Sequence, residues 1–433
     1  VTGVQTCALP ISTGSVANIK ISDVKDLPVL SVDQALQGRV AGADIMSTTG
    51  EPGATTSIRI RGTRSISASN LAALDAAVLA KFTGAQIGAL STGQLGALSP
   101  VNRLHSSNSP FTTKEPWTFG PRAFGVISRF LRLRHRLIPM LYTAAWRAHT
   151  DAVAVVRPMY HDHPLADDAY SVPNQYLLGE HLLVAPITTP EDRLAKLGAV
   201  RAWLPDGAWF DAFTGQRYGG GRHLTLHRSL ERVPVLARAG SVLPLADALA
   251  PVVDAPARLT LRVFPGDGVS HLAEDHGEGA PAEPNVTRFV QALNLRDDGL
   301  ADLRLTIEPT TGPDPLAGRE IALEIVGAVG VEGIDAEIVT DELLSPALRV
   351  ELGRVSSDGA TVVLTGLHPA TSDLVGDAFA LLDAAEIAFT TKEAAWSAVK
   401  RLDGLPLAQE LTTLDLPPVL RDALLERAAA TTA

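Results

Sequence analysis

The sequence predicts a mixed α and β protein, and three observations indicate this fold class. Residues 122–150 carry apolar residues at three- to four-residue spacing with arginines between them, which predicts an amphipathic helix. Short apolar runs separated by turn residues follow between 153 and 245 and again from 259 to about 339, a spacing that favours antiparallel sandwiches. The segments 392–400 and 418–430 predict a helical tail.

Each element follows from its local pattern. Pro139 lacks a backbone N–H and should kink the helix over 122–150. Near the start of the chain, Ser31 is a helix-capping residue before a short predicted helix over 32–40, and residues 57–62 alternate apolar and charged side chains as a half-exposed strand does. The later strands are predicted at 153–157, 176–178, 182–185, 199–204, 233–236, 242–245, 259–264, 303–307 and 321–325.

Aromatic residues are distributed unevenly along the 433-residue chain. One of the 21 aromatic residues lies in 1–98, fifteen lie in 99–218 and five lie in 219–433. Because aromatic side chains supply much of the buried area of a core, we expect residues 1–98 to pack poorly. Four tryptophans are expected in the core of the later part: Trp117, Trp146, Trp203 and Trp209.

Charge and cysteine content exclude several classes of partner. The net charge of −11 and the isoelectric point near 5.5 argue against nucleic acid or an anionic membrane surface as a partner. The sequence has no run of 18 uncharged apolar residues, so no membrane span is predicted. The single cysteine, Cys7, excludes an intramolecular disulfide and a cysteine-based zinc site.

Three short motifs suggest chemistry but have simpler explanations. The run His161-Asp162-His163 suggests a metal pair, yet adjacent strand residues point to opposite faces. Gly219-Gly220-Gly221 lacks the Lys-Ser/Thr and the helix of a phosphate loop, so it predicts a turn. Residues 274–278 lack calcium-loop spacing and predict a solvated hairpin tip. We therefore assign no metal and no cofactor.

Residues 13–70 resemble the plug domain of TonB-dependent outer-membrane receptors of the SusC type. The resemblance rests on SVDQALQGRVAG, STTGEPGA and SIRIRGTRSISASN, over about 55 residues. The large membrane barrel of that family does not follow in this sequence, so transport cannot be assigned from this piece. Two copies of an eight-residue repeat, at 83–90 and 91–98, then indicate a low-complexity linker.

From Ser99 onward the sequence resembles glycoside hydrolase family 31, which comprises α-glucosidases, α-xylosidases and relatives. The resembling motifs arrive in family order over about 150 residues: 99–111, 114–117, 132–139, 156–160, 174–186, 203–211 and 234–240. The resemblance implies the terminal piece of a (β/α)8 barrel, two β-sandwich-type domains and the helical tail. It also implies retaining hydrolysis of α-linked glucosides or xylosides, with an α-linked oligosaccharide as the partner.

The sequence contains only some of the residues that this hydrolysis requires. Retaining hydrolysis needs two carboxylates about 5–5.5 Å apart. In the family both carboxylates are aspartates on barrel strands that precede the segment corresponding to Arg103-Leu104-His105. None of the aspartates in the first 98 residues has the sequence neighbours of the family's nucleophile or of its general acid/base: Asp23, Asp26, Asp33, Asp44 and Asp75. We assign no catalytic residue and expect this chain to be inactive alone. The resemblance gives one substrate-binding residue, His105, at the carboxyl-terminal face of the barrel.

The chain is therefore interpreted as chimeric or misassembled. The resemblances place the glycosidase part in the cytoplasm and the parent of the plug-like part in the outer membrane. Two alternatives stay open: a fragment of a TonB-dependent glycan receptor, and a non-catalytic carbohydrate-binding protein. The predicted parts are an adapter-like artefact (1–12), the plug-like fragment (13–70), the linker (71–98), the end of the barrel (99–158), a proximal β-sandwich (159–248), a distal β-domain (249–340) and a C-terminal extension with the helical tail (341–433).

Overall fold

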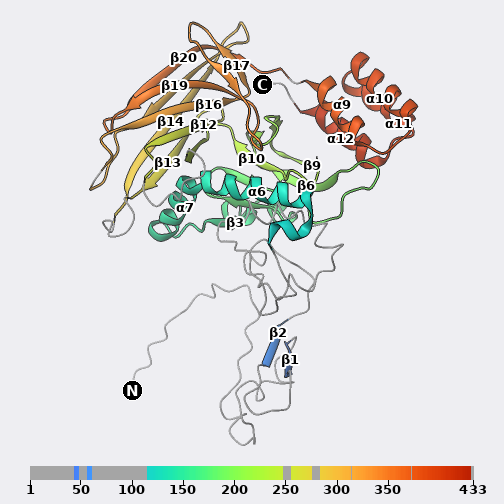
Figure 1. Cartoon of the computed structure of the whole chain (residues 1–433), viewed down its shortest axis with the longest axis horizontal. Helices are drawn as coiled ribbons and strands as arrows, with labels where there is room; N and C mark the ends of the chain where they lie inside the picture. The colour runs from blue at the N-terminus through green and yellow to red at the C-terminus, as the bar shows by residue number, and fades with distance from the viewer. Residues whose placement is uncertain are drawn as a thin grey trace, which may run out of the picture. The chain divides into compact units, whose positions relative to one another are not determined.

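The computed structural model divides the chain into two units, Val1–Ile66 and Ser67–Ala433 (Figure 1). The described residues are 43–47, 56–60, 115–246, 255–275, 283–313, 315–371 and 373–430. In the first unit, β1 (Ala43–Ser47) pairs antiparallel with β2 (Thr56–Ile60). The strand predicted at 57–62 is thus confirmed as β2. The predicted helix at 32–40, the repeat at 83–98 and His105 lie outside the described residues.

The predicted helix over 122–150 is two helices. The 3-10 helix η2 (Pro116–Phe119) leads into α6 (Pro121–Arg136), and α7 (Ile138–Thr150) follows after Leu137. The break lies two residues before Pro139, whose ring cannot continue the hydrogen-bond ladder, so the predicted kink is confirmed. Two arginines of α6 form ion pairs: Arg132 lies 3.1 Å from Glu342, and Arg136 contacts Asp341.

A six-stranded sheet follows these helices and is buried on both faces. Alternate residues of one strand face opposite cores: Leu178 packs in the core that includes Phe130 of α6, whereas Leu177 packs in the core that includes Trp203. The strand order is β3 (Val156–Pro158), β4 (Tyr176–Leu178), β5 (Leu182–Val184), β10 (Val235–Arg238), β7 (Ala208–Asp211) and β8 (Arg217–Gly219). A separate antiparallel pair, β6 (Gly198–Leu204) and β9 (Arg222–Arg228), contributes to the second core.

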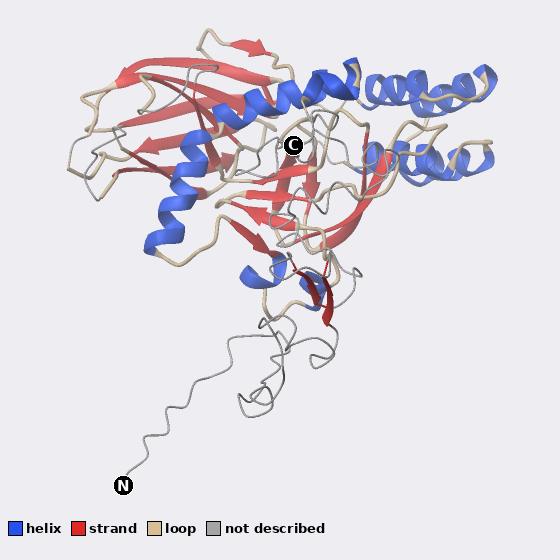
Figure 2. Ribbon diagram, turned by 60° about the horizontal axis from the view of Figure 1, so that its bottom comes forward, coloured by secondary structure: helices blue, strands red, loops and turns tan. Residues whose placement is uncertain are grey.

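Two five-stranded sheets share one apolar core and form a β-sandwich (Figure 2). The strands predicted at 259–264, 303–307 and 321–325 are confirmed within it. The first sheet has the order β11 (Val242–Ala246), β12 (Arg258–Val263), β16 (Arg319–Val326), β19 (Ala347–Val355) and β18 (Glu337–Val339). The second has the order β13 (Gly268–Glu274), β14 (Asn285–Leu295), β15 (Ala301–Ile307), β20 (Ala360–Pro369) and β17 (Ala328–Val331).

Four helices form the tail and have their own apolar core. They are α9 (Leu374–Ala384), α10 (Phe389–Arg401), α11 (Gly404–Thr413) and α12 (Pro418–Ala429). Ala195 and Leu197, from the turn before β6, complete this core. The helices predicted at 392–400 and 418–430 are confirmed as α10 and α12. The barrel piece and the domain boundaries stay predictions.

Two expectations about burial are wrong. Trp117 is 66% exposed, because η2 buries Pro116 instead, and Trp146 is half-buried, whereas Trp203 and Trp209 lie in the core as expected. Glu274, expected on a solvated hairpin tip, is buried at the end of β13. Arg319 donates to both oxygens of the Glu274 carboxylate, and this bidentate pair compensates for the loss of water.

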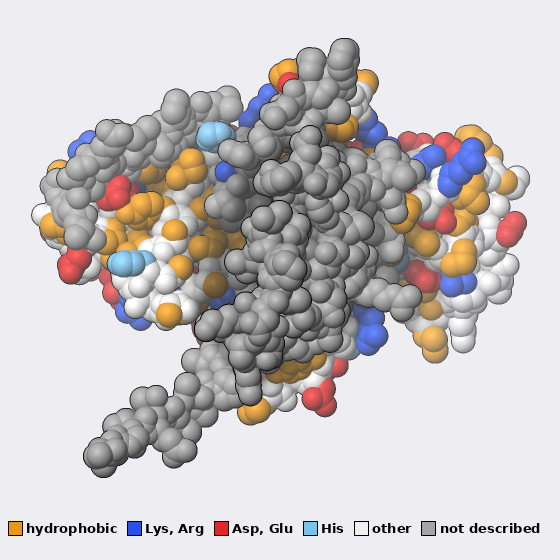
Figure 3. Space-filling model, turned by 90° about the horizontal axis from the view of Figure 1, so that it is seen from below, with side chains coloured by type: hydrophobic (Ala, Val, Ile, Leu, Met, Phe, Trp, Pro, Cys, Tyr) orange, Lys and Arg blue, Asp and Glu red, His pale blue; other side chains and the backbone are white. Residues whose placement is uncertain are grey.

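The surface combines charged side chains with exposed apolar ones. In the view from below, hydrophobic side chains reach the surface beside charged groups and histidines (Figure 3). The exposed apolar residues of the described part include several aromatic side chains: Trp117, Phe119, Phe124, Tyr142, Tyr160, Tyr170, Phe379 and Phe389. Among the described residues, no helix combines the length and the apolar character needed to cross a bilayer.

Candidate functional site

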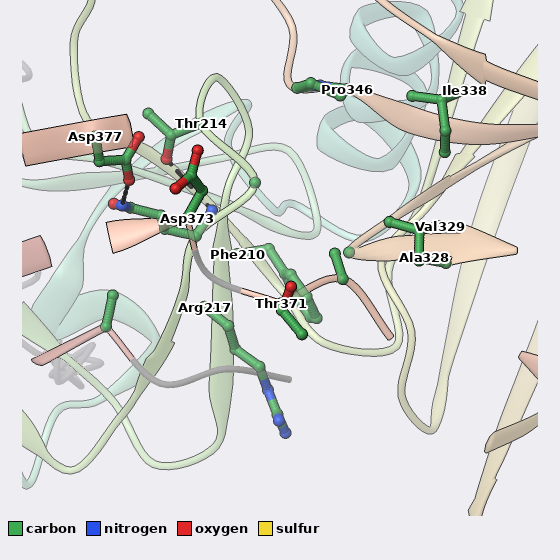
Figure 4. Close-up of a pocket in the computed structure, with 15 residues that line it drawn as sticks. Phe210, Thr214, Arg217, Ala328, Val329, Ile338, Pro346, Thr371, Asp373 and Asp377 are labelled. Carbon is green, nitrogen blue, oxygen red and sulfur yellow. Dashed lines mark hydrogen bonds between the residues drawn. The ribbon is translucent and has the colours of Figure 1, made fainter. Parts of the chain in front are cut away.

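The candidate site of the described residues is a cleft of about 280 Å³ between the sheet, the sandwich and the tail. Phe210 of β7 and Gln216 line it from the six-stranded sheet, Val329 of β17 lines it from the sandwich, and Asp373 and Asp377 line it from the start of α9. Figure 4 shows the two carboxylates at one end of the cleft and the apolar side chains at the other. The cleft therefore offers a polar end and an apolar end.

The polar end is already hydrogen-bonded. Gln216 donates from Nε2 to Asp377 Oδ2 at 2.7 Å, and its Oε1 accepts from the Tyr218 hydroxyl at 2.9 Å. Asp373 caps α9, because its Oδ1 accepts from the backbone N–H of Gly376 at 2.9 Å. Both carboxylates hold α9 in place and can accept further hydrogen bonds, so this end suits a polar ligand.

Behind the polar end lies a buried network of charges centred on Arg228 of β9. Its guanidinium donates to Asp211 Oδ2 from Nη2 at 2.6 Å and to Glu426 Oε1 from Nη1 at 2.8 Å. Glu426 of α12 also accepts from the backbone N–H of His227 at 2.7 Å and contacts His227 Nδ1 at 2.8 Å. One arginine thus connects the strand β7 with the last helix of the tail.

The turn after β7 explains why Asp211 lies here. Its Oδ1 accepts from the backbone N–H groups of Phe213 and Thr214, both at 2.8 Å, and this side-chain turn ends the strand. Gly215 completes the turn with φ of 77°, a conformation that favours glycine. The other carboxylate oxygen is then directed at Arg228.

The charges of the network determine its ionisation. Burial alone would raise the pKa of Glu426, but the charge of Arg228 and the hydrogen bond from His227 outweigh it and lower this pKa to about 2. Burial lowers the pKa of Arg228, yet Asp211 and Glu426 raise it well above its ordinary value. Burial raises the pKa of the Tyr218 hydroxyl. Glu426 is therefore ionised throughout the neutral range.

A second cluster surrounds Glu180, in the turn between β4 and β5. Arg147 of α7 donates to its carboxylate, and His271 of β13 contacts it through Nδ1 at 3.0 Å and the backbone N–H at 3.2 Å. His181 Nε2 lies 3.1 Å away but out of line for a hydrogen bond. Burial raises the pKa of Glu180, and the two histidines more than reverse this and hold it well below its usual range.

Neither cluster resembles a metal centre. Within the described ranges, no group of three or more His, Cys, Asp or Glu side chains is placed to hold a metal ion. Arg157 donates to both oxygens of Asp162 at 3.0 Å, so the middle residue of the His161–His163 run takes part in an ion pair. The substrate-binding role of His105 stays a prediction, since that residue lies outside the described part.

Two segments of the chain match known domains. Residues 92–144 match the TIM-barrel domain of glycosyl hydrolases family 31, and residues 152–243 match the C-terminal domain of that family. These two segments of the chain are therefore similar to domains of glycosyl hydrolase family 31. The first match contains α6 and part of α7, and the second contains the six-stranded sheet and the β6–β9 pair.

Curated relatives include α-xylosidases and α-glucosidases. The alpha-xylosidase of Saccharolobus solfataricus is 32% identical over 187 residues, which are 41% of this chain and 24% of the relative. Alpha-glucosidase 2 of Bacillus thermoamyloliquefaciens is 33% identical over 137 residues, which are 32% of this chain and 17% of the relative. The chain thus spans about a quarter or less of the length of these relatives.

Solved structures share the fold of much of this chain. The cycloalternan-forming enzyme from Listeria monocytogenes has a TM-score of 0.54 at 19% identity and covers 67% of this chain and 28% of its own. The family 31 dextranase of Flavobacterium johnsoniae has a TM-score of 0.51 at 19% identity and covers 64% of this chain and 38% of its own.

Proposed function

We propose that the family 31 part of this chain is the C-terminal part of a retaining α-glycosidase that hydrolyses α-linked glucosides or xylosides. The relatives named alpha-xylosidase and alpha-glucosidase support this substrate class. Within this proposal, His105 contacts the sugar, and the described residues brace the catalytic barrel rather than carry out the reaction.

One observation about buried carboxylates supports the bracing role. The buried acidic residues of the described part are Asp211, Glu274, Glu324 and Glu426, and each contacts an arginine. A general acid must hold a proton at the working pH, whereas a neighbouring guanidinium favours the ionised carboxylate. These side chains are therefore suited to joining elements of the fold and unsuited to protonating a leaving group.

Hydrolysis of chromogenic substrates tests the proposal. The full chain should release no p-nitrophenol from p-nitrophenyl α-glucoside or α-xyloside above the rate in buffer, because no aspartate pair in the family context is assigned. A purified relative such as the Saccharolobus solfataricus alpha-xylosidase is the positive control for the assay. Turnover by the full chain that increases in proportion to its concentration would contradict the proposal.

A further inference from the structure

Two tyrosines form an exposed aromatic pair between β3 and β4. The rings of Tyr160, in the short helix α8 (Met159–Asp162), and Tyr170, in the 3-10 helix η3 (Asp167–Tyr170), stack with centroids 5.2 Å apart and planes inclined by 10°. Tyr160 is 47% exposed and Tyr170 is 59% exposed. Each ring covers one face of the other, and much of each ring remains accessible to solvent.

The segment that carries the pair is firmly held. The Tyr170 hydroxyl donates to the carbonyl of Pro164 at 3.0 Å, and Ser171 Oγ donates to the carbonyl of Asp168 at 2.8 Å. Met159 and Ala169, the residues next to the two tyrosines in sequence, are buried in the core below. The rings are therefore fixed before any ligand binds, which reduces the entropy cost of binding.

Hydrogen-bonding side chains flank the rings. Asp168, two residues before Tyr170, contacts His223 Nε2 at 2.8 Å and is 57% exposed. His161, next to Tyr160, is exposed and contacts Asp162 at 2.7 Å. Carboxylates and imidazoles with this exposure can accept from and donate to neighbouring hydroxyl groups.

We propose that the Tyr160–Tyr170 pair binds an α-linked glucan chain. The C–H face of a pyranose ring packs against the accessible aromatic face, and the sugar hydroxyls hydrogen-bond to Asp168 and His161. The choice of an α-linked sugar rests on the proposed function. A protein partner fits less well, because a stable interface buries about 800 Å² on each side, whereas two half-exposed aromatic side chains supply only about 200 Å².

Calorimetric titration of the full chain with maltohexaose tests this site. The wild-type chain should bind, and Tyr160→Ala and Tyr170→Ala should each weaken the affinity about tenfold. Tyr160→Phe keeps the ring and should retain the affinity. Phe389→Ala is the matched control, since it removes another aromatic side chain, 79% exposed, from the tail. Circular dichroism melting shows whether each variant is folded.

Several results would overturn the site. These are no binding by the wild type, unchanged affinity in folded Tyr160→Ala and Tyr170→Ala, or equal weakening by Phe389→Ala. Equal affinity for cellohexaose, the β-linked counterpart, would overturn the assignment to α-linked chains. The p-nitrophenyl assay is independent of these measurements. Turnover together with tyrosine-dependent binding would refute the proposed function alone, whereas absence of binding would refute the site alone.

Discussion

At the scale of single residues, Glu426 joins the tail to the strands. It accepts hydrogen bonds from Arg228 and from the backbone N–H of His227, and its side chain is almost fully buried. Arg228 is equally buried and is neutralised by Glu426 and Asp211 together. Removing one partner of such a pair leaves an uncompensated charge in the interior, and this costs more than the loss of one contact.

Glu426→Gln should therefore lower the free energy of unfolding by about 3–5 kcal/mol. The amide keeps the size of the side chain but removes one of the two carboxylates that neutralise Arg228. Urea unfolding followed by circular dichroism measures the change. Asp422→Asn is the matched control, because it removes an exposed carboxylate of the same helix and should change stability by less than about 0.5 kcal/mol. Equal effects of the two variants would show that the buried pair contributes nothing specific.

Residues of this kind could be predicted only in part. Trp203 and Trp209 were correctly expected in the core from the density of aromatic residues over 99–218, whereas Trp117 lies in the same stretch and is exposed. The density of aromatic residues does not distinguish them, because burial depends on which element packs above the side chain. The carboxylate of Asp377 and the amide of Gln216 meet across 161 residues of sequence, so the sequence alone could not bring the candidate cleft together.

At the scale of elements, the strands β4 and β5 were predicted from continuous apolar runs, and β2 from its alternation of apolar and charged residues. The strand β9 was missed, because its sequence RHLTLHR carries few apolar residues and its buried polar residues are compensated only by distant elements, Asp211 of β7 and Glu426 of α12. The helix α11 was also missed. Its first turn contains Gly404 and Pro406, residues that indicate a turn, although proline is tolerated at that end of a helix.

The predicted turn at Gly219–Gly221 is confirmed between β8 and β9, and it leads to a prediction about Gly220. A Cβ atom there would lie 1.9 Å from the carbonyl oxygen of Pro205, so the backbone would have to move. Gly220→Ala should lower the stability by about 1–3 kcal/mol. Gly219→Ala is the control, because a Cβ atom at that position meets nothing within 4 Å. Thermal unfolding of both variants gives the comparison. Equal melting temperatures would contradict the close approach of residue 220 to the carbonyl oxygen of Pro205.

At the scale of the whole molecule, two carboxylates, the half-buried Glu180 and the buried Glu426, join regions that are distant in sequence. Glu180 connects α7 with β13, and Glu426 connects β9 with α12. The pKa of Glu426 is lowered from 4.5 to about 2, and that of Glu180 is lowered further. A carboxyl whose pKa is depressed by folding stabilises the folded state above its unfolded pKa. That contribution is lost as the pH falls towards its folded pKa.

The full chain should therefore keep an almost constant melting temperature from pH 7 to pH 5 and lose stability steeply between about pH 4.5 and pH 2. Glu180→Gln and Glu426→Gln should each lower the stability at pH 7. Each should also flatten the acid limb, which is the part of the curve of melting temperature against pH that falls below about pH 4.5, because the amide has no proton to gain. Asp422→Asn should leave the limb as steep as in the wild type. Thermal melts at half-unit pH steps provide the measurement. An acid limb of wild-type steepness in both glutamine variants would show that other carboxylates, and not these two connections, control acid unfolding.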